Sequence, residues 1–259
     1  MRAKGELMGM RRGLVCFSFV TVVLLAGAWD ARAQGPAADE SPWVLDFGFG
    51  IEPSINGNVN SGAIGVLQGQ TAAILPNSYG DVYGTGISLR FGGGYTLNEV
   101  SELRGMFIYQ SADANLVRLG DIGPSSLYGQ YSDYKSFALD LGYRRYAPLS
   151  IKDLRVYGEG TIGIGWINRI NVQLAAPQSN IAFTNNDFYD RTAAFTIGVN
   201  AGILLKIADQ VDFNAQLGLR HVSGLSDVDQ LVGTGLATIN NDSARLTFPI
   251  VVGVRFRFK

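Results

Sequence analysis

Residues 246–259, LTFPIVVGVRFRFK, end the chain with two patterns superimposed on one segment. The positions between the apolar residues include Thr247, Arg255 and Arg257. Because successive side chains of a β-strand point to opposite faces, this pattern predicts a strand with one unbroken apolar face and one arginine-bearing face. The apolar face consists of every second residue: Leu246, Phe248, Ile250, Val252, Val254, Phe256 and Phe258.

Seven more segments show the same alternation, and several exceed the roughly 5–6 residues of a typical strand. We expect strands at 43–51, 82–97, 99–110, 133–147, 153–168, 190–207 and 210–222, with the last strand at 244–258. Three connections are short, whereas the other four are long and polar: 52–81, 111–132, 169–189 and 223–243. Short turns that alternate with long loops are typical of a transmembrane β-barrel.

We therefore predict an all-β fold, a transmembrane antiparallel up-and-down β-barrel with eight strands. The first long connection contains AIGVLQGQTAAIL, residues 63–75, which has enough apolar residues for one further hairpin. That hairpin would raise the number of strands to ten.

The two faces of these strands predict which side meets lipid. An eight-stranded barrel has an interior just wide enough for side chains to fill, and the large apolar residues would overfill it. We expect the apolar face to meet lipid and the charged face to line the lumen. Since buried charges need partners or water, the charges of both signs should form a salt-bridge network that plugs the lumen rather than an ion path. The predicted network comprises Asp46, Arg90, Glu102, Arg104, Asp140, Arg144, Arg155, Glu159, Asp212, Arg220, Arg255 and Arg257.

The N-terminus has the pattern of an export signal. Arg11 and Arg12 precede the apolar run 13–28, and Ala31 and Ala33 occupy the small-residue positions before a cleavage site. We predict a signal peptide at 1–33, a short periplasmic segment at 34–42 and an outer-membrane barrel domain at 43–259. Met8 and Met10 are alternative starts, and the single cysteine lies within the apolar run, so the mature chain has no disulfide.

Composition excludes several other classes of function. The net charge of −1 shows no basic footprint, so we expect no nucleic-acid partner. Asp227 and Asp229 are loop carboxylates, but two acids are too few for a calcium site. We predict no metal and no cofactor.

In this layout, residues 43–258 resemble the small eight-stranded outer-membrane β-barrel proteins of Gram-negative bacteria. In that family the last strand ends in an aromatic residue preceded by alternating apolar residues, which the barrel-assembly machinery reads. This assembly signal is matched by Val252, Val254, Phe256 and Phe258, although Lys259 makes the aromatic residue penultimate. The resemblance implies the cell outer membrane as location. It also implies outer-membrane lipids, lipopolysaccharide and, during insertion, the barrel-assembly machinery as partners.

One candidate catalytic set stands apart from the lumen. His221, the only histidine, and Ser223 share a strand face, and Asp242 has the same parity near the facing end of the last strand. Such a set can attack an acyl ester, and the His-x-Ser spacing resembles that of lipid A 3-O-deacylases, in which asparagine follows the serine where this chain has Gly224. We expect a non-enzymatic structural or surface-interaction role. The alternatives are a narrow conduit for small or hydrophobic solutes and a deacylase-like ester hydrolase.

Overall fold

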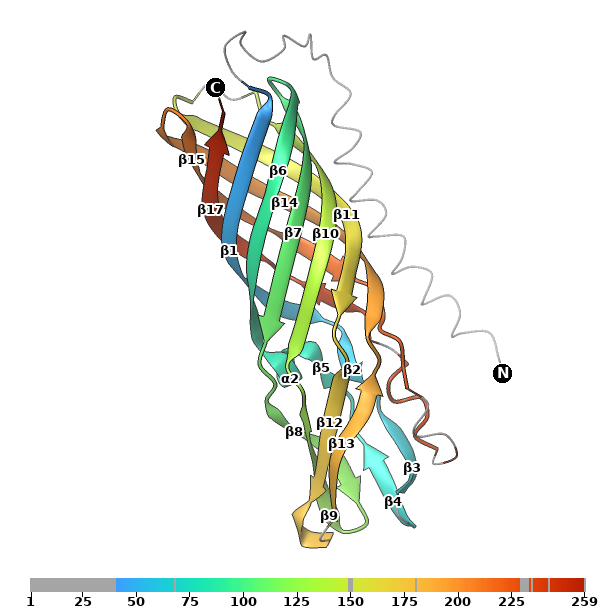
Figure 1. The fold of residues 1–259 in the computed structure, drawn as a ribbon. Helices are drawn as coiled ribbons and strands as arrows, with labels where there is room; N and C mark the ends of the chain where they lie inside the picture. Colours follow the sequence, from blue (N-terminus) through green and yellow to red (C-terminus); the bar gives the residue numbers. More distant parts are fainter. Residues whose placement is uncertain are drawn as a thin grey trace, which may run out of the picture.

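The computed structural model describes residues 41–258 except 68, 149–150, 180, 229–232, 234 and 242. The predicted signal peptide and most of the segment 34–42 therefore lie outside the described residues. The described chain is almost entirely antiparallel β-structure, arranged as two main sheets stacked end to end along one axis (Figure 1). Within this part of the chain, no helix has both the length and the apolar character needed to cross a bilayer.

The larger sheet is a closed barrel in which each strand pairs with its neighbours along the chain. Pairing of β1 with β17 closes the ring. The predicted all-β, antiparallel, up-and-down barrel is confirmed. Its strands are β1 (Trp43–Asn56), β6 (Thr85–Asn98), β7 (Ser101–Ala112), β10 (Tyr134–Tyr146), β11 (Leu154–Ile167), β14 (Thr192–Ala208), β15 (Val211–Val222), β16 (Arg245–Thr247) and β17 (Ile250–Arg257).

β16 and β17 are two halves of the final strand, separated by Phe248 and Pro249. Both halves pair with β15 on one side and with β1 on the other. Proline has no N–H to donate to a ladder, which explains the break, yet the Pro249 carbonyl still accepts a hydrogen bond from the Gly218 N–H at 3.0 Å. The nine strands of this sheet thus occupy eight positions around the ring.

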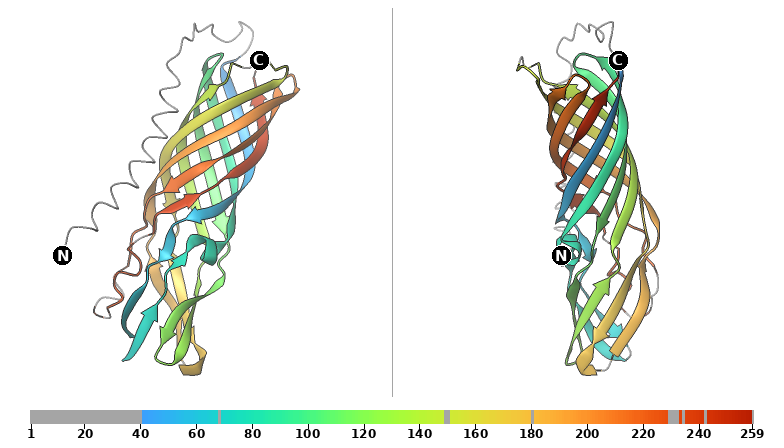
Figure 2. Two further views of the ribbon diagram at one scale, coloured as in Figure 1. Left: turned by 180° about the vertical axis from the view of Figure 1, so that it is seen from behind. Right: turned by 60° about the vertical axis from the view of Figure 1, so that its left-hand side comes forward.

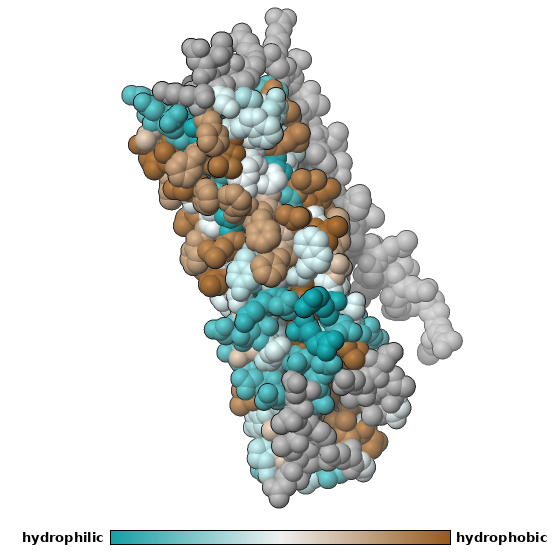
Figure 3. All heavy atoms as spheres, viewed as in Figure 1, coloured by the Kyte–Doolittle hydropathy of each residue, from teal (hydrophilic) through white to brown (hydrophobic). Residues whose placement is uncertain are grey.

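Apolar side chains cover the outside of the barrel, and Figure 3 shows them as a broad band on the side in view. Phe47 and Leu89 are 44% and 53% exposed. The register places such residues side by side, and the rings of Phe47 and Phe91 lie 4.9 Å apart. At the short-turn end, Trp43 packs edge-on against Tyr95 at 5.0 Å. Soluble proteins rarely expose apolar surface on this scale, so the exterior is suited to lipid, with aromatic residues at the boundary.

The smaller sheet is built from three of the four long connections, and we call it the extension (Figures 1 and 2). Its strand order is β13-β12-β9-β8-β4-β3. The interpretation of these connections as long polar loops was therefore wrong, because each folds into a hairpin. The hairpin expected within 63–75 exists as β3–β4, but it pairs with β8 and adds no strand to the barrel. The six strands are β3 (Ala63–Leu67), β4 (Gln70–Ile74), β8 (Leu116–Ile122), β9 (Ser125–Tyr131), β12 (Ile170–Ala176) and β13 (Ile181–Tyr189).

Short elements connect the two sheets. β2 (Asn58–Asn60) pairs with β5 (Asn77–Ser78), and β5 leads into the short helix α2 (Tyr79–Tyr83). Ser78 caps this helix, since its hydroxyl accepts a hydrogen bond from the Asp81 N–H at 3.1 Å. The Asp81 carboxylate in turn accepts a hydrogen bond from the Ser78 N–H. A single turn of 3-10 helix, η2 (Pro177–Ser179), follows β12.

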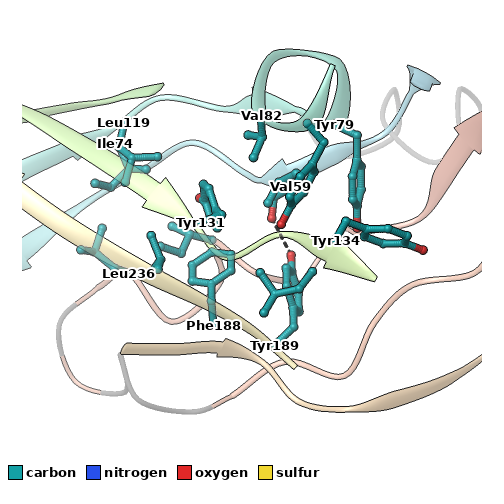
Figure 4. Packing of buried hydrophobic residues seen from close by; sticks show 14 of the residues in the cluster. Val59, Ile74, Tyr79, Val82, Leu119, Tyr131, Tyr134, Phe188, Tyr189 and Leu236 are labelled. Carbon is teal, nitrogen blue, oxygen red and sulfur yellow. Dashed lines mark hydrogen bonds between the residues drawn. The ribbon is translucent and has the colours of Figure 1, made fainter. Parts of the chain in front are cut away.

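The larger apolar core of the described chain belongs to the extension and the adjoining barrel mouth, not to the barrel interior (Figure 4). Buried residues from all four long connections meet there, including Ile74, Leu127 and Leu236. Buried hydroxyls within this core find acceptors: Tyr189 donates to the Val59 carbonyl at 2.6 Å. Apolar residues within otherwise polar connections therefore account for the folding of the extension.

Described residues of the fourth long connection, 223–244, lie beside the extension. β3 and β13 are the two edges of the sheet, and this connection contacts both. Asn240 Nδ2 donates to the Phe188 carbonyl beside one edge at 3.0 Å. Near the other edge, a Cβ on Gly235 would lie 3.2 Å from the Gly65 Cα, so the two backbones pass closely. We call residues 223–244 the strap.

Candidate functional site

The barrel interior holds a cluster of ion pairs centred on Arg104. Its guanidinium lies 2.9 Å from Asp46, 3.5 Å from Glu102 and 2.5 Å from Glu159. Arg144 binds the same Glu159 oxygen at 2.8 Å. All five side chains are buried, and they project from β1, β7, β10 and β11. This cluster therefore cross-links four strands through the lumen.

Arg255 joins the cluster from the last strand. It forms an ion pair with Glu102, lies 3.9 Å from Asp46 and donates to the hydroxyl of Tyr146. Tyr146 in turn donates to Glu102 at 2.9 Å. The arginine-bearing face of the final strand thus contacts side chains of β1, β7 and β10.

A second group of pairs lies on the extension side of the lumen. Arg90 binds Glu52 at 2.8 Å, and Arg220 binds Asp140 at 3.3 Å. Thr196 donates to Asp140 at 2.8 Å. A cavity of about 20 Å³ is lined by Arg90, Asp140 and Arg220 of this group together with Arg104 and Glu159. That volume is enough for about one water molecule.

Close packing in the lumen also depends on small residues facing the charges. A Cβ on Gly163 would lie 2.3 Å from an Asp140 carboxylate oxygen, and one on Gly94 would lie 2.6 Å from Glu102. Neither position has room for a side chain. Glycines therefore leave the space that the charged side chains occupy.

Two predicted members of the network lie at the short-turn rim. Arg257 pairs with the buried Asp212 at 3.2 Å but is itself partly exposed. Arg155 lies outside the buried ion-pair cluster: its side chain is exposed, stacks over the Tyr146 ring at 3.6 Å and donates to the Glu99 carbonyl. Its strand parity is that of Glu159, but it lies where the lumen opens to solvent.

Glu52 was missed because the first strand was predicted to end at 51. The strand continues to Asn56, and Glu52 shares the parity of Asp46, so extending the alternation by one residue would have found it. Tyr157 was missed as well. Its ring lies 3.7 Å from the Arg144 guanidinium, and its hydroxyl donates to Asn214 at 2.7 Å.

Charge in the described barrel interior is balanced. The buried acids are Asp46, Glu52, Glu102, Asp140, Glu159 and Asp212, and the buried arginines are Arg90, Arg104, Arg144, Arg220, Arg245 and Arg255. Six negative charges thus face six positive charges. Because a buried charge is costly unless it is paired, this balance favours an interior without net charge.

Arg245 lies at the junction between the lumen and the extension. It is buried, its Nε donates to the Ser54 hydroxyl at 2.9 Å, and its guanidinium lies 4.4 Å from the Tyr134 ring and 5.4 Å from the Tyr79 ring. Burial raises the pKa of Tyr79 well above its usual value, so this phenol remains neutral. Aromatic faces are favourable partners for a guanidinium. Arg245 and these tyrosines therefore close the extension-side mouth of the lumen.

The candidate catalytic residues are only partly brought together. The Ser223 hydroxyl accepts a hydrogen bond from the Phe195 N–H at 3.0 Å, and its own N–H donates to the Phe195 carbonyl at 2.9 Å. It thereby continues the pairing of β14 and β15. Among the hydrogen bonds of the described residues, none joins His221 to Ser223. Asp242 lies outside the described residues.

The other predicted sites are less well defined. Asp229 lies outside the described residues, and no group of three metal-ligating side chains occurs in the part of the chain that the structure describes. In the predicted assembly signal, Val252 pairs with Phe49 and Phe256 pairs with Leu45. Phe258 is exposed and accepts a hydrogen bond from the Ser41 N–H at 3.1 Å. Lys259 lies outside the described residues.

The closed antiparallel sheet, its apolar exterior and its balanced, charged interior define a transmembrane β-barrel of the small outer-membrane type. No protein-family model matches the chain, and no curated protein matches it.

Similar solved structures include Neisserial surface protein A, at 14% identity and a TM-score of 0.43, with 83% of this chain and 96% of that chain covered. The outer membrane protein OprG from Pseudomonas aeruginosa is 12% identical with a TM-score of 0.43, covering 85% and 97%. The outer membrane protease OmpT from Escherichia coli is 10% identical with a TM-score of 0.40, covering 87% and 100%. The fold assignment rests on the strand pairing of this chain.

Proposed function

We propose that this chain is an integral outer-membrane protein that holds a rigid β-sheet extension at the cell surface, without enzymatic activity and without solute conduction. The buried ion pairs that cross-link the strands through the lumen, around a cavity of about 20 Å³, carry this proposal. They favour a structural or surface-interaction role over the conduit.

Membrane placement follows from the exterior of the barrel. An open strand edge cannot be satisfied in hydrocarbon, and the ring of strands leaves none. Barrels of this type place short turns in the periplasm and long connections outside the cell. The extension then lies outside the cell, with outer-membrane lipids and lipopolysaccharide around the barrel. Export by the predicted signal peptide and insertion by the barrel-assembly machinery complete the proposal.

The extension supports a surface role because it is folded rather than loose. Its strands enclose an apolar core, and its exterior carries exposed side chains such as Ile64, Leu116 and Tyr128. Amphipathic and apolar residues on a rigid surface are common in binding interfaces. A rigid surface also loses less conformational entropy on binding than a flexible loop.

Conductance of the purified protein in a planar lipid bilayer tests the closed lumen. We expect no discrete channels in the wild-type protein. Arg245→Ala combined with Tyr79→Ala removes two of the side chains at the mouth but keeps the ion pairs around Arg104, so this comparison variant should permit at most small, brief openings. Regular wild-type channels of stable conductance would contradict the proposal and favour the conduit.

The absence of ester hydrolysis is tested separately. Lipid A from cells with the protein, without it and with Ser223→Ala should give identical mass spectra. Loss of one 3-O-linked acyl chain that requires Ser223 would show that the chain is an enzyme. His221→Ala is the second variant, because an ester hydrolase of this kind would need both His221 and Ser223 for the loss of the acyl chain.

A further inference from the structure

The extension contains a cavity of about 140 Å³ that no part of the proposed function uses. Its walls come from every long connection: Ile74 from the first, Leu119 and Leu127 from the second, Phe188 from the third and Leu236 from the strap. Figure 4 shows Ile74, Leu119, Phe188 and Leu236 gathered in this part of the core. An apolar cavity of about 150 Å³ in another protein binds benzene, so this cavity has room for a ligand of about six non-hydrogen atoms.

Most polar groups around the cavity are already satisfied. Asn60 Nδ2 donates to the Leu75 carbonyl at 2.7 Å, and its Oδ1 accepts from the Tyr131 hydroxyl at 3.0 Å. Asn240 Nδ2 donates to the carbonyls of Phe188 and Val228. These hydrogen bonds hold the walls of the cavity together.

Asn186 is different. It lies on β13 two residues before Phe188, and both residues line the cavity. Its Nδ2 is buried and has no hydrogen-bond partner, and it is the one side-chain atom of which this is true among the described lining residues. A buried donor without an acceptor is unfavourable. A water molecule is a poor remedy, because buried waters typically need 2–4 polar partners, about three on average.

The charges of the lining residues determine whether a ligand of this cavity can itself be charged. The only charged residue among the described lining residues is Asp187, and its carboxylate is engaged by Arg169 at 3.1 Å. Both of these side chains are at least partly exposed. A charged ligand would have no counter-ion within the cavity, so the cavity favours a neutral molecule.

We infer that the extension binds a small, uncharged, largely apolar molecule that presents one hydrogen-bond acceptor, such as a carbonyl or ether oxygen, to Asn186 Nδ2. From the strap, the described residues Leu236, Ile239 and Asn240 contribute to the wall of this cavity. The site belongs to the extension alone, so it stands or falls independently of whether the lumen conducts.

The test uses two probes of the same shape. Cyclopentanone carries a carbonyl oxygen where methylenecyclopentane carries a CH₂ group. Each is titrated into the full-length mature protein in detergent micelles, and binding is followed through the ¹³C-methyl NMR signals of Leu119 and Leu127. We expect saturable shifts with both probes. Asn186→Leu should weaken cyclopentanone binding by roughly fivefold, as expected for loss of one hydrogen bond, and should leave methylenecyclopentane binding unchanged or stronger.

Two controls make the outcome decisive. Asn115→Leu changes an exposed asparagine outside the cavity and should alter neither titration. Val172→Phe fills the cavity from its wall and should abolish the shifts of both probes. Absence of saturable shifts in the wild-type protein, or shifts that persist in a folded Val172→Phe variant, would overturn the inference. Equal weakening of both probes by Asn186→Leu would overturn the role of the acceptor. If Val172→Phe fails to fold, the comparison between Asn186→Leu and Asn115→Leu decides alone.

Discussion

Replacing Glu159 by glutamine removes one negative charge from the balanced interior of the barrel. Glu159 accepts Arg104 at 2.5 Å and Arg144 at 2.8 Å, and all three side chains are almost fully buried. Glu159→Gln would leave these two arginines facing each other with one positive charge in excess. Removing one partner of a buried pair typically costs about 3–5 kcal/mol, so we expect the free energy of unfolding to fall by about that amount.

The assay is equilibrium unfolding by guanidinium chloride in lipid vesicles, followed by the fluorescence of Trp43 and Trp166. Asp209→Asn is the matched control: Asp209 pairs with Lys206 at 3.3 Å, but its side chain is 85% exposed, so the change should be within about 0.5 kcal/mol. Combining Glu159→Gln with Arg144→Met restores the charge balance and should recover about 2 kcal/mol of the loss. If Glu159→Gln is no more destabilising than Asp209→Asn, the interior is solvated by water and the reasoning is refuted.

Three further changes test other parts of the structure. Because burial raises the pKa of Tyr79, the folded chain keeps this phenol neutral at a pH where the unfolded chain ionises it. Ionisation of Tyr79 should therefore leave the stability of the extension unchanged below about pH 10 and lower it above that pH. An ultraviolet titration at 295 nm in which every tyrosine of the folded protein ionises near pH 10 would contradict this. Gly163→Ala places a Cβ 2.3 Å from Asp140 and should cost about 1–3 kcal/mol in the same unfolding assay, whereas Gly105→Ala, with open space at its Cβ, should cost far less. Phe258→Ala should lower the amount of folded protein in the outer membrane without changing the stability of the folded fraction by more than about 1 kcal/mol; wild-type amounts on fractionation would remove Phe258 from the assembly signal.

The barrel was predictable because its strands are long and their alternation is strict. In these strands apolar residues recur at every second position, as around Phe47 and Leu89 and in the final strand. This period directly gives the face of the sheet that each side chain occupies. Parity gives the face but not the depth within the barrel. Arg155 has the parity of a lumen residue, yet it lies at the rim and is exposed. Glu52 was lost for a related reason, since the end of its strand was placed too early.

The extension was not predictable from the same signal. Its strands are short: the sequence indicated a hairpin only within 63–75, and it gave no such indication for Leu116–Ile122 and Ser125–Tyr131, because short apolar runs are ambiguous. Its core depends on contacts between connections far apart in sequence: the Tyr189 hydroxyl reaches the Val59 carbonyl across 130 residues. The cavity beside Asn186 has no local sequence pattern at all. Only the assembled sheet reveals it.

Display of the extension at the cell surface is the central claim, and single cysteines test it most directly. The predicted mature chain has no cysteine, so Ile64→Cys on the extension, 75% exposed, and Asp209→Cys in a short turn can each be labelled with a membrane-impermeant maleimide on intact cells. The account predicts that Cys at position 64 is labelled on intact cells, whereas Cys at position 209 is labelled only after the outer membrane is permeabilised. Labelling at 209 but not at 64 on intact cells would contradict it.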